Sequence, residues 1–272
     1  VRMGHMRGQG AARRGTNEAL GLVTAAVGSR QAPAANVVVV TIDGYRWQEM
    51  FSGAAQEYFT RDSKGQPGAM EKRFWRETPQ ERRAVLTPFL WNDVAVQGQI
   101  FGDPAAGSLA HVTNGLWFSY PGYNEMFAGR ADPRVDSNRK IPNPNVTVME
   151  WLNHRPGFAG RVAAFGAWDV LPSILNAERS GIPVGSGFAP VPRPSTPAEH
   201  AINTLATDLP TFWDYGPVDA PIVYAALESL RTSQPRVLYI MLGEVDEWAH
   251  LGKYDQYVDA VYRSDQFIKR LW

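Results

Sequence analysis

Residues Leu238 to His250 read LYIMLGEVDEWAH, an apolar run that turns abruptly into a polar cluster. A short apolar run after a Gln-Pro break predicts a buried strand, and the polar cluster begins where that strand would leave the sheet. Ligands of open α/β sheets bind just beyond the carboxyl ends of the strands. Asp246 and His250 stand four residues apart, so one helical turn would place them on one face, and a carboxylate with an imidazole suits zinc. The alternative interpretation is a solvated first turn of a surface helix.

A second strand signal lies about two hundred residues upstream, where residues 36–42 read NVVVVTI. A continuous β-branched run predicts a strand that is buried on both faces, as in a parallel sheet. Asp43-Gly44 follows directly, which places a carboxylate at the tip of the strand, although the same pair is also typical of a plain turn. In a parallel sheet, Asp43 and Asp246 would meet at the same edge.

The rest of the chain alternates between strand and helix patterns. Strands are expected at 161–165 and, more weakly, at 99–102, and irregular segments at 45–81, 129–145 and 181–197. Helices are expected at 83–96, 121–127, 146–154, 168–176, 198–209, 218–231 and 254–271. This alternation predicts an α/β fold of three layers, αβα, around a mostly parallel, doubly wound sheet. We assign residues 36–272 to this domain.

The composition excludes several classes of function. The 272 residues carry 27 basic and 27 acidic side chains, so no charge excess argues for nucleic acid or an anionic membrane as a partner. No apolar run is long enough to predict a membrane span. Cysteine is absent, which leaves Asp, Glu, His and hydroxyl oxygens as the candidate metal ligands.

Residues 1–35 are expected to lie outside the fold, as a leader or a disordered extension. Four arginines precede a weakly apolar stretch at 19–27, and Ala32-Pro33-Ala34 is similar to a small-residue cleavage site. These are the parts of an export leader, which predicts a periplasmic or secreted protein.

A third polar site is expected at Ser119. Pro121 favours the first turn of a helix, so Ser119 would lie near a helix N-terminus, where backbone N–H groups favour a negative charge. A plain N-cap is the alternative role for this serine.

Three motifs together resemble the alkaline phosphatase superfamily, and within it the type I phosphodiesterase/nucleotide pyrophosphatase branch. They are VVTIDGYRWQE at 39–49, FSYPGYNE at 118–125 and GEVDEWAH at 243–250, with weaker similarity at 145–176. The resemblance runs from about residue 36 to the C-terminus. It implies an alkaline phosphatase-like fold and hydrolysis of a small phosphate ester substrate at a site that binds two zinc ions.

The resemblance also implies roles for individual residues. Asp43 and Ser119 would bind one zinc ion, with Ser119 as nucleophile, and Asp246 and His250 would bind the other. Asn138, with Asn124 as second choice, would contact the phosphoryl group. Gly122 stands where the pyrophosphatases often have Asn, so a nucleotide substrate is not implied, and the choice between monoester and diester stays open. The aromatic residues Tyr45, Trp47, Trp117, Tyr120 and Tyr123 would either stack on a base or sugar or serve as packing.

The chain departs from the family in its ligand set. The family has a second Asp-His pair and one further His, but none of the five histidines here follows an Asp. We therefore expect a C-terminally truncated member with an incomplete fold, with an open sheet edge and the apolar face of helix 254–271 uncovered. If zinc is bound tightly all the same, Glu244 or His111 becomes a candidate ligand. The alternatives are a non-catalytic domain with a residual metal or anion site and, ranked lower, a sulfatase, which would need Arg in place of Tyr123.

Overall fold

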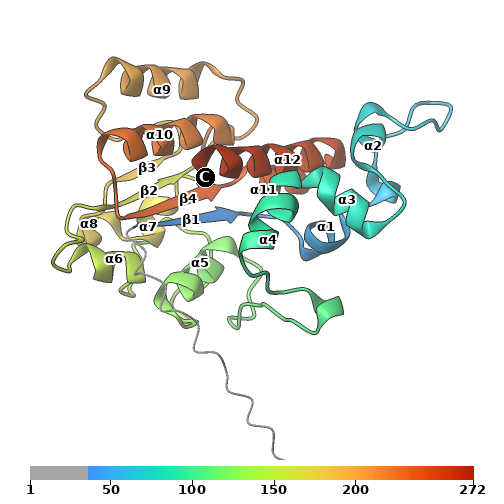
Figure 1. Ribbon diagram of the computed structural model, residues 1–272. Helices are drawn as coiled ribbons and strands as arrows, with labels where there is room; N and C mark the ends of the chain where they lie inside the picture. The colour runs from blue at the N-terminus through green and yellow to red at the C-terminus, as the bar shows by residue number, and fades with distance from the viewer. Residues whose placement is uncertain (1–35) are drawn as a thin grey trace, which may run out of the picture. The chain divides into compact units, whose positions relative to one another are not determined.

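The computed structural model describes residues 36–272, so the predicted leader lies outside the described part of the chain. The described residues form an α/β domain around a four-stranded, wholly parallel sheet (Figure 1). Its strands are β1 (Val37–Ile42), β2 (Val162–Gly166), β3 (Val184–Ser186) and β4 (Val237–Leu242), in the order β1-β4-β2-β3. The predicted α/β class and parallel sheet are confirmed.

The two strands predicted most strongly lie side by side. β1 pairs with β4 in parallel from Val37 opposite Val237 to Ile42 opposite Leu242. β4 also pairs with β2, and every residue of β4 is buried, which explains its uninterrupted apolar sequence. β1 pairs with no other strand among residues 36–272, and Val37 and Val38 are 46% and 42% exposed. β1 is therefore an edge strand of the described sheet with no fully buried residue, and the expectation that it is buried on both faces was wrong.

The described chain contains twelve α-helices. They are α1 (Trp47–Ser52), α2 (Ala69–Phe74), α3 (Pro79–Leu86), α4 (Ala95–Gln97), α5 (Ser119–Ala128), α6 (Val148–Asn153), α7 (Leu171–Ile174), α8 (Ala177–Ser180), α9 (Pro197–Asp208), α10 (Asp219–Thr232), α11 (Glu244–His250) and α12 (Tyr254–Leu271). Figure 1 shows α9, α10 and α12 over one face of the sheet and α5 to α8 beneath the other. Helices on both faces agree with a three-layer arrangement.

Alternate residues of β4 build two separate cores. Tyr239 and Met241 pack with residues of α5, α6 and α7, whereas Leu238, Ile240 and Leu242 pack against α10 and α12. This division follows from the two-residue period of a strand, which sends successive side chains to opposite faces. A third core joins α2, α3 and α11 to the apolar face of α12. The expectation that this face of α12 is uncovered was wrong, because Tyr257, Val258 and Val261 are buried there.

Several predicted element boundaries were wrong. No strand forms at 99–102, and the segment 181–197 contains β3. The helix expected at 83–96 begins earlier, at Pro79, where Thr78 and Glu81 form a capping box, and its regular part ends at Leu86 before Pro88. The helix expected at 168–176 is only the short helix α7, and a second short helix, α8, follows Asn176, which has a φ of 43°.

The excursion at 45–81 contains helices α1 and α2, although it was expected to be irregular. The other predicted helices are present within about two residues of their expected ends. No helix of the described residues is long and apolar enough to cross a membrane.

Candidate functional site

A cavity of about 370 Å³ opens at the carboxyl ends of the strands. Five of the six predicted site residues line it: Asp43, Ser119, Asn138, Asp246 and His250. They come from the tip of β1, the start of α5, the loop at 129–145 and helix α11. The topology of a parallel sheet thus gathers residues that lie up to two hundred positions apart in sequence, as the sequence predicted.

Gly44 lets the turn after β1 contact helix α11, which follows β4. It has a φ of 73°, and a Cβ atom on it would lie 2.4 Å from the Cα and 2.8 Å from the backbone nitrogen of Asp246. No side chain larger than hydrogen fits at that distance. Gly44 is therefore the residue that allows Asp43 and Asp246 to lie close together.

Ser119 faces Asp43 at the start of α5. The serine is the first helical residue, two positions before the predicted start at Pro121, and it does not act as an N-cap. Its Oγ donates a hydrogen bond to Asp43 Oδ1 at 3.4 Å. Tyr123, one turn further along α5, donates its hydroxyl hydrogen to Asp43 Oδ2 at 3.1 Å. One carboxylate thus connects the end of β1 to the candidate nucleophile.

The N-terminus of α5 offers fewer free N–H groups than expected. Asn138 Oδ1 accepts the backbone N–H of Tyr120 at 3.0 Å, and Pro121 has no N–H. The Oδ1 contact fixes the amide of Asn138 and leaves its Nδ2 group as the donor that a ligand in the cavity can use. The expectation of several free helix N–H donors at this end of α5 is thus wrong, because Asn138 and Pro121 leave few of them.

Asp246 and His250 lie on one face of α11, as their spacing predicts. His250 Nε2 is 3.2 Å from Asp246 Oδ2, with the histidine side chain 75% exposed and the aspartate 27% exposed. Burial raises the pKa of Asp43, and hydrogen bonds from Tyr123 and Ser119 oppose the change. Burial, together with the nearby charge of Asp43, raises the pKa of Asp246 to about 6. A carboxylate whose proton affinity is raised by burial and by a second carboxylate lies at a site that favours an added positive charge.

Glu244 has a structural role that excludes it as the spare metal ligand. It is 4% exposed; Arg263 donates to its Oε1, and so does Trp248 Nε1, at 3.2 Å. Its Oε2 accepts the N–H of Asp219, at the start of α10, while Asp219 Oδ1 accepts the N–H of Gly243 at 2.8 Å. Each carboxylate therefore caps the other's helix, and the pair fixes the turn from β4 into α11.

This pair predicts an effect of pH on stability. Burial, and then the charge of Glu244, raise the pKa of Asp219 to about 7. Because the folded pKa lies above the unfolded one, stability from this group is complete below about pH 4 and is lost as the pH rises through about 7. We expect Asp219→Asn, which keeps the accepting oxygen, to match wild type at pH 4 and to exceed its free energy of unfolding by at least about 1 kcal/mol at pH 8. Urea unfolding at both pH values measures this, with the exposed Asp214→Asn as control; equal differences at the two pH values would contradict it.

His111 lies in a neighbouring hollow rather than in the main cavity. That hollow has a volume of about 570 Å³, and Asp43 and Ser119 line it as well. His111 is exposed, in the irregular stretch before α5. It is therefore near the candidate nucleophile but is not gathered with the other predicted ligands.

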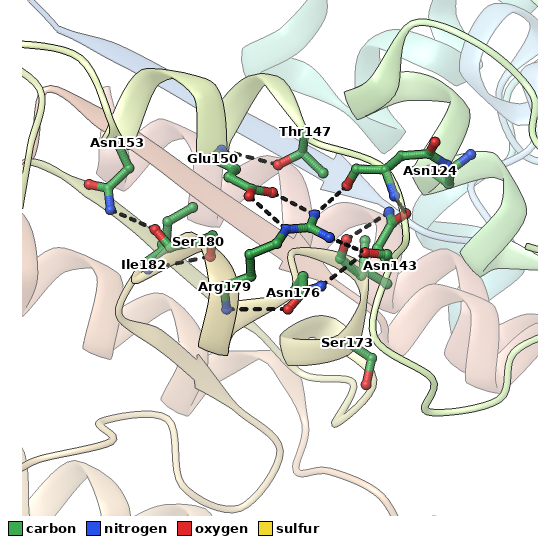
Figure 2. A network of polar contacts seen from close by, with 12 residues as sticks. Asn124, Asn143, Thr147, Glu150, Asn153, Ser173, Asn176, Arg179, Ser180 and Ile182 are labelled. Carbon is green, nitrogen blue, oxygen red and sulfur yellow. Dashed lines mark hydrogen bonds and ion pairs between the residues drawn. The ribbon is translucent and has the colours of Figure 1, made fainter.

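Asn124 lies in a buried polar network away from the cavity (Figure 2). Its Oδ1 accepts from Asn145 Nδ2 at 3.0 Å. The centre of the network is Arg179, which binds both carboxylate oxygens of Glu150 at 2.7 Å and the backbone oxygens of Asn143 and Asn145 at 3.0 and 2.6 Å. Asn124 is thus a structural residue of this network, which ties down the loop that carries Asn138.

Loss of Arg179 should weaken the fold and the loop together. The Glu150 side chain is 3% exposed and that of Arg179 37%, so Arg179→Ala leaves a buried carboxylate without its partner. We expect a loss of about 2 to 3 kcal/mol, below the full cost of breaking a completely buried pair because Arg179 is partly exposed. Chemical unfolding measures this. Arg231→Ala, which breaks the surface pair with Glu228, should leave the midpoint near wild type; an equal loss in both variants would contradict the prediction.

The sequence did not single out the other side of the cavity. Lys140 Nζ pairs with Asp169 Oδ2 at 2.5 Å, and Trp168, Trp213 and Tyr215 form aromatic walls. Trp168 and Asp169 follow the end of β2, so the strand-end argument used for β1 and β4 would have found them. Trp213 and Tyr215 lie between α9 and α10 and carry no such signal.

The five aromatic residues proposed for stacking do not line the main cavity. Tyr120 and Tyr123 are buried in the core beside the sheet, and Tyr45 packs against the core of α12. Trp47 and Trp117 are exposed.

The residues present fit zinc in kind but not in number. Carboxylate, hydroxyl and imidazole are suitable donors, yet no three His, Asp or Glu side chains among residues 36–272 are gathered closely enough to hold one ion. Comparisons with protein-family models, with curated proteins and with solved structures found no match, so the alkaline phosphatase resemblance stays a hypothesis drawn from the three motifs.

Proposed function

We propose that this chain has an alkaline phosphatase-like domain that hydrolyses small phosphate esters, with Ser119 as the nucleophile. The observation that carries the proposal is the contact of Ser119 Oγ with Asp43 Oδ1 in a cavity that Asp246 and His250 also line. A serine needs activation by a base or by a metal to attack phosphorus at neutral pH. His250 is paired with Asp246 rather than with Ser119, which argues against a serine-histidine pair as the source of activation.

The charge of the cavity supports a need for metal ions. Asp43, Asp169, Asp246 and Glu247 line it, whereas Lys140 is the one lysine or arginine among its lining residues and is already paired with Asp169. A phosphate ester is an anion, so these carboxylates would repel it unless cations are bound first. Zinc, when bound, would supply positive charge at the attacking and leaving oxygens. Asp43 with Ser119, and Asp246 with His250, would hold the two ions.

Other residues of the cavity would orient the ester. Asn138 has a free Nδ2 donor beside the start of α5 and suits a phosphoryl oxygen. Tyr123 holds the Asp43 carboxylate, and burial keeps the pKa of this tyrosine well above its usual range, so it stays a hydrogen-bond donor. Trp168, Trp213 and Tyr215 would bind the organic part of the substrate through their apolar surfaces.

The second candidate is a domain that binds a metal or an anion without catalysis. The absence of three gathered ligands among the described residues favours it, since zinc usually takes three or four protein ligands. With two protein donors for each ion, this cavity should bind zinc less tightly than sites with three or four protein ligands do.

Zinc titration and turnover separate the two candidates. The catalytic proposal expects up to two zinc ions per chain at saturation and release of nitrophenol from p-nitrophenyl phosphate or bis(p-nitrophenyl) phosphate, both abolished by a chelator. Asp246→Asn should remove one ion, and Asp214→Asn, an exposed control, should remove none. One ion or none, without turnover of either ester at saturating zinc, would favour the non-catalytic domain.

A further inference from the structure

A second cavity, of about 260 Å³, shares no lining residue with the first, although α11 borders both. Its walls are Tyr58, Trp248, Tyr254 and Tyr257, and Arg46 and Lys253 are its cations. None of its lining residues is acidic. The volume lies below the roughly 300 to 1,000 Å³ of pockets for drug-sized molecules, so the cavity suits a smaller ligand.

The aromatic walls are held in place by polar contacts at their outer ends. Tyr254 and Tyr257 stack with ring centroids 5.6 Å apart, and Tyr58 meets Tyr254 edge-on at 5.3 Å. The hydroxyl of Tyr254 donates to Glu49 Oε1 at 3.1 Å and accepts from the N–H of Ala55 at 2.8 Å. Burial raises the pKa of Tyr257 to about 12, so its hydroxyl stays neutral and lies 3.4 Å from Glu49 Oε2. Tyr257 is 2% exposed and forms the buried base beneath Tyr254, so the half-buried Tyr254 is the ring of this pair that a ligand can reach.

The cations retain free donors. Glu49, which is 1% exposed, binds the Nε of Arg46 at 2.9 Å and also its Nη2. The guanidinium carbon lies 5.6 Å and 5.9 Å from the ring centres of Tyr58 and Tyr257, and Nη1 makes no hydrogen bond to any residue in 36–272. Lys253 is exposed and makes no side-chain bond within the same part of the chain. Glu49 therefore balances Arg46 and orients it, while the charge of Lys253 stays unbalanced at the cavity.

We infer that this cavity binds a small planar aromatic anion, such as an aryl carboxylate, sulfonate or phosphate. The ring packs against Trp248 and Tyr254, and the anionic group is bound by Arg46 Nη1 and the ammonium of Lys253. Aromatic surface beside fixed cations supplies both halves of this recognition, because the ring gains apolar contact and the anion gains charge-assisted hydrogen bonds. Aromatic packing alone would give neither a free guanidinium donor nor an excess of positive charge at the same place.

Nuclear magnetic resonance titration of the whole chain with naphthalene-2-sulfonate tests the inference. We expect saturable shifts of the Trp248 indole N–H and contacts between naphthalene protons and the rings of Tyr58 and Tyr254. Lys253→Gln should weaken binding about tenfold or more, as should the paired change Arg46→Gln with Glu49→Gln, which leaves no buried charge unpaired. Lys140→Gln, which removes the lysine of the first cavity, should not change the affinity.

Matched ligands separate the two halves of recognition. Naphthalene-2-methanol keeps the ring without the charge, and methanesulfonate keeps the charge without the ring, so both should bind much more weakly than naphthalene-2-sulfonate. The inference is overturned if the sulfonate gives no saturable shift or if the neutral alcohol binds equally tightly. It is also overturned if Lys140→Gln weakens binding as much as Lys253→Gln does. None of these results depends on phosphate ester hydrolysis.

Discussion

Ser119→Ala should lower the rate of phosphate ester hydrolysis at saturating zinc by about a thousandfold or more, because loss of a nucleophile removes several orders of magnitude of rate. The change deletes only the hydroxyl that faces Asp43, and α5 keeps its other contacts with the core. The fold should therefore persist, which thermal unfolding of the variant checks. Wild type should also carry a phosphoryl group on the peptide that contains Ser119 when hydrolysis is stopped by acid, and the variant should not.

Ser229→Ala is the matched control for this experiment. Ser229 is also a helical serine, on α10, and it lines a different hollow. Its loss should leave the rate unchanged. If Ser119→Ala kept more than about a hundredth of the wild-type rate, Ser119 would not be the nucleophile, and activation of a water molecule would replace it in the proposal.

β4 was predictable because a continuous apolar run is typical of a strand that is covered on both faces, and all of its residues are buried. β1 has a similar run and does form a strand, but it lies at the edge of the sheet and none of its residues is fully buried. β3 has three residues, Val184, Gly185 and Ser186, and carries no such pattern. Gly185 is required by tertiary structure, since a Cβ there would lie 1.8 Å from the Pro190 carbonyl oxygen. A contact of that kind has no local sequence signal.

The site was predictable to the extent that it follows strand ends. Asp43 and Asp246 come after the two strongest strands, and the fold brings them together. Asn138 and Lys140 reach the cavity from an irregular loop, whose path depends on the Arg179 network rather than on its own sequence. The resemblance supplied Asn138, and nothing in the sequence supplied Lys140. Residues whose position depends on long-range polar contacts, such as Lys140, therefore could not be predicted from the sequence to lie in the cavity.

Glu244 is a second residue whose role could not be predicted from the sequence. Its place next to Asp246 made it a reasonable spare ligand, because a carboxylate at a strand end is as suitable for a metal as for a helix cap. In the structure, the Glu244 carboxylate contacts Arg263, Trp248 and the backbone N–H of Asp219. Of these three residues, only Trp248 is close to Glu244 in the sequence. Which role a buried carboxylate takes is decided by partners that only the fold brings to it.

Gly44→Ala should be among the most destabilising single changes in the chain, with an expected loss above about 3 kcal/mol. A left-handed backbone alone costs an alanine about 1 kcal/mol. At Gly44 the new methyl group would also lie 2.4 Å from the Cα of Asp246, so the turn after β1 and helix α11 would have to separate. The carboxylates of Asp43 and Asp246 would separate with them, and any zinc bound between them would be lost.

Gly65→Ala isolates the cost of the backbone conformation. Gly65 has a φ of 72°, against 73° at Gly44, but a Cβ there would meet nothing within 4 Å. We expect this control to lose only about 1 kcal/mol and to keep its zinc content and its turnover. Urea unfolding of both variants measures the difference, which reports the contact between the turn after β1 and helix α11 rather than glycine's conformational freedom. Equal losses in the two variants would show that the turn and the helix do not touch at Gly44, and the site built on their contact would then fail with it.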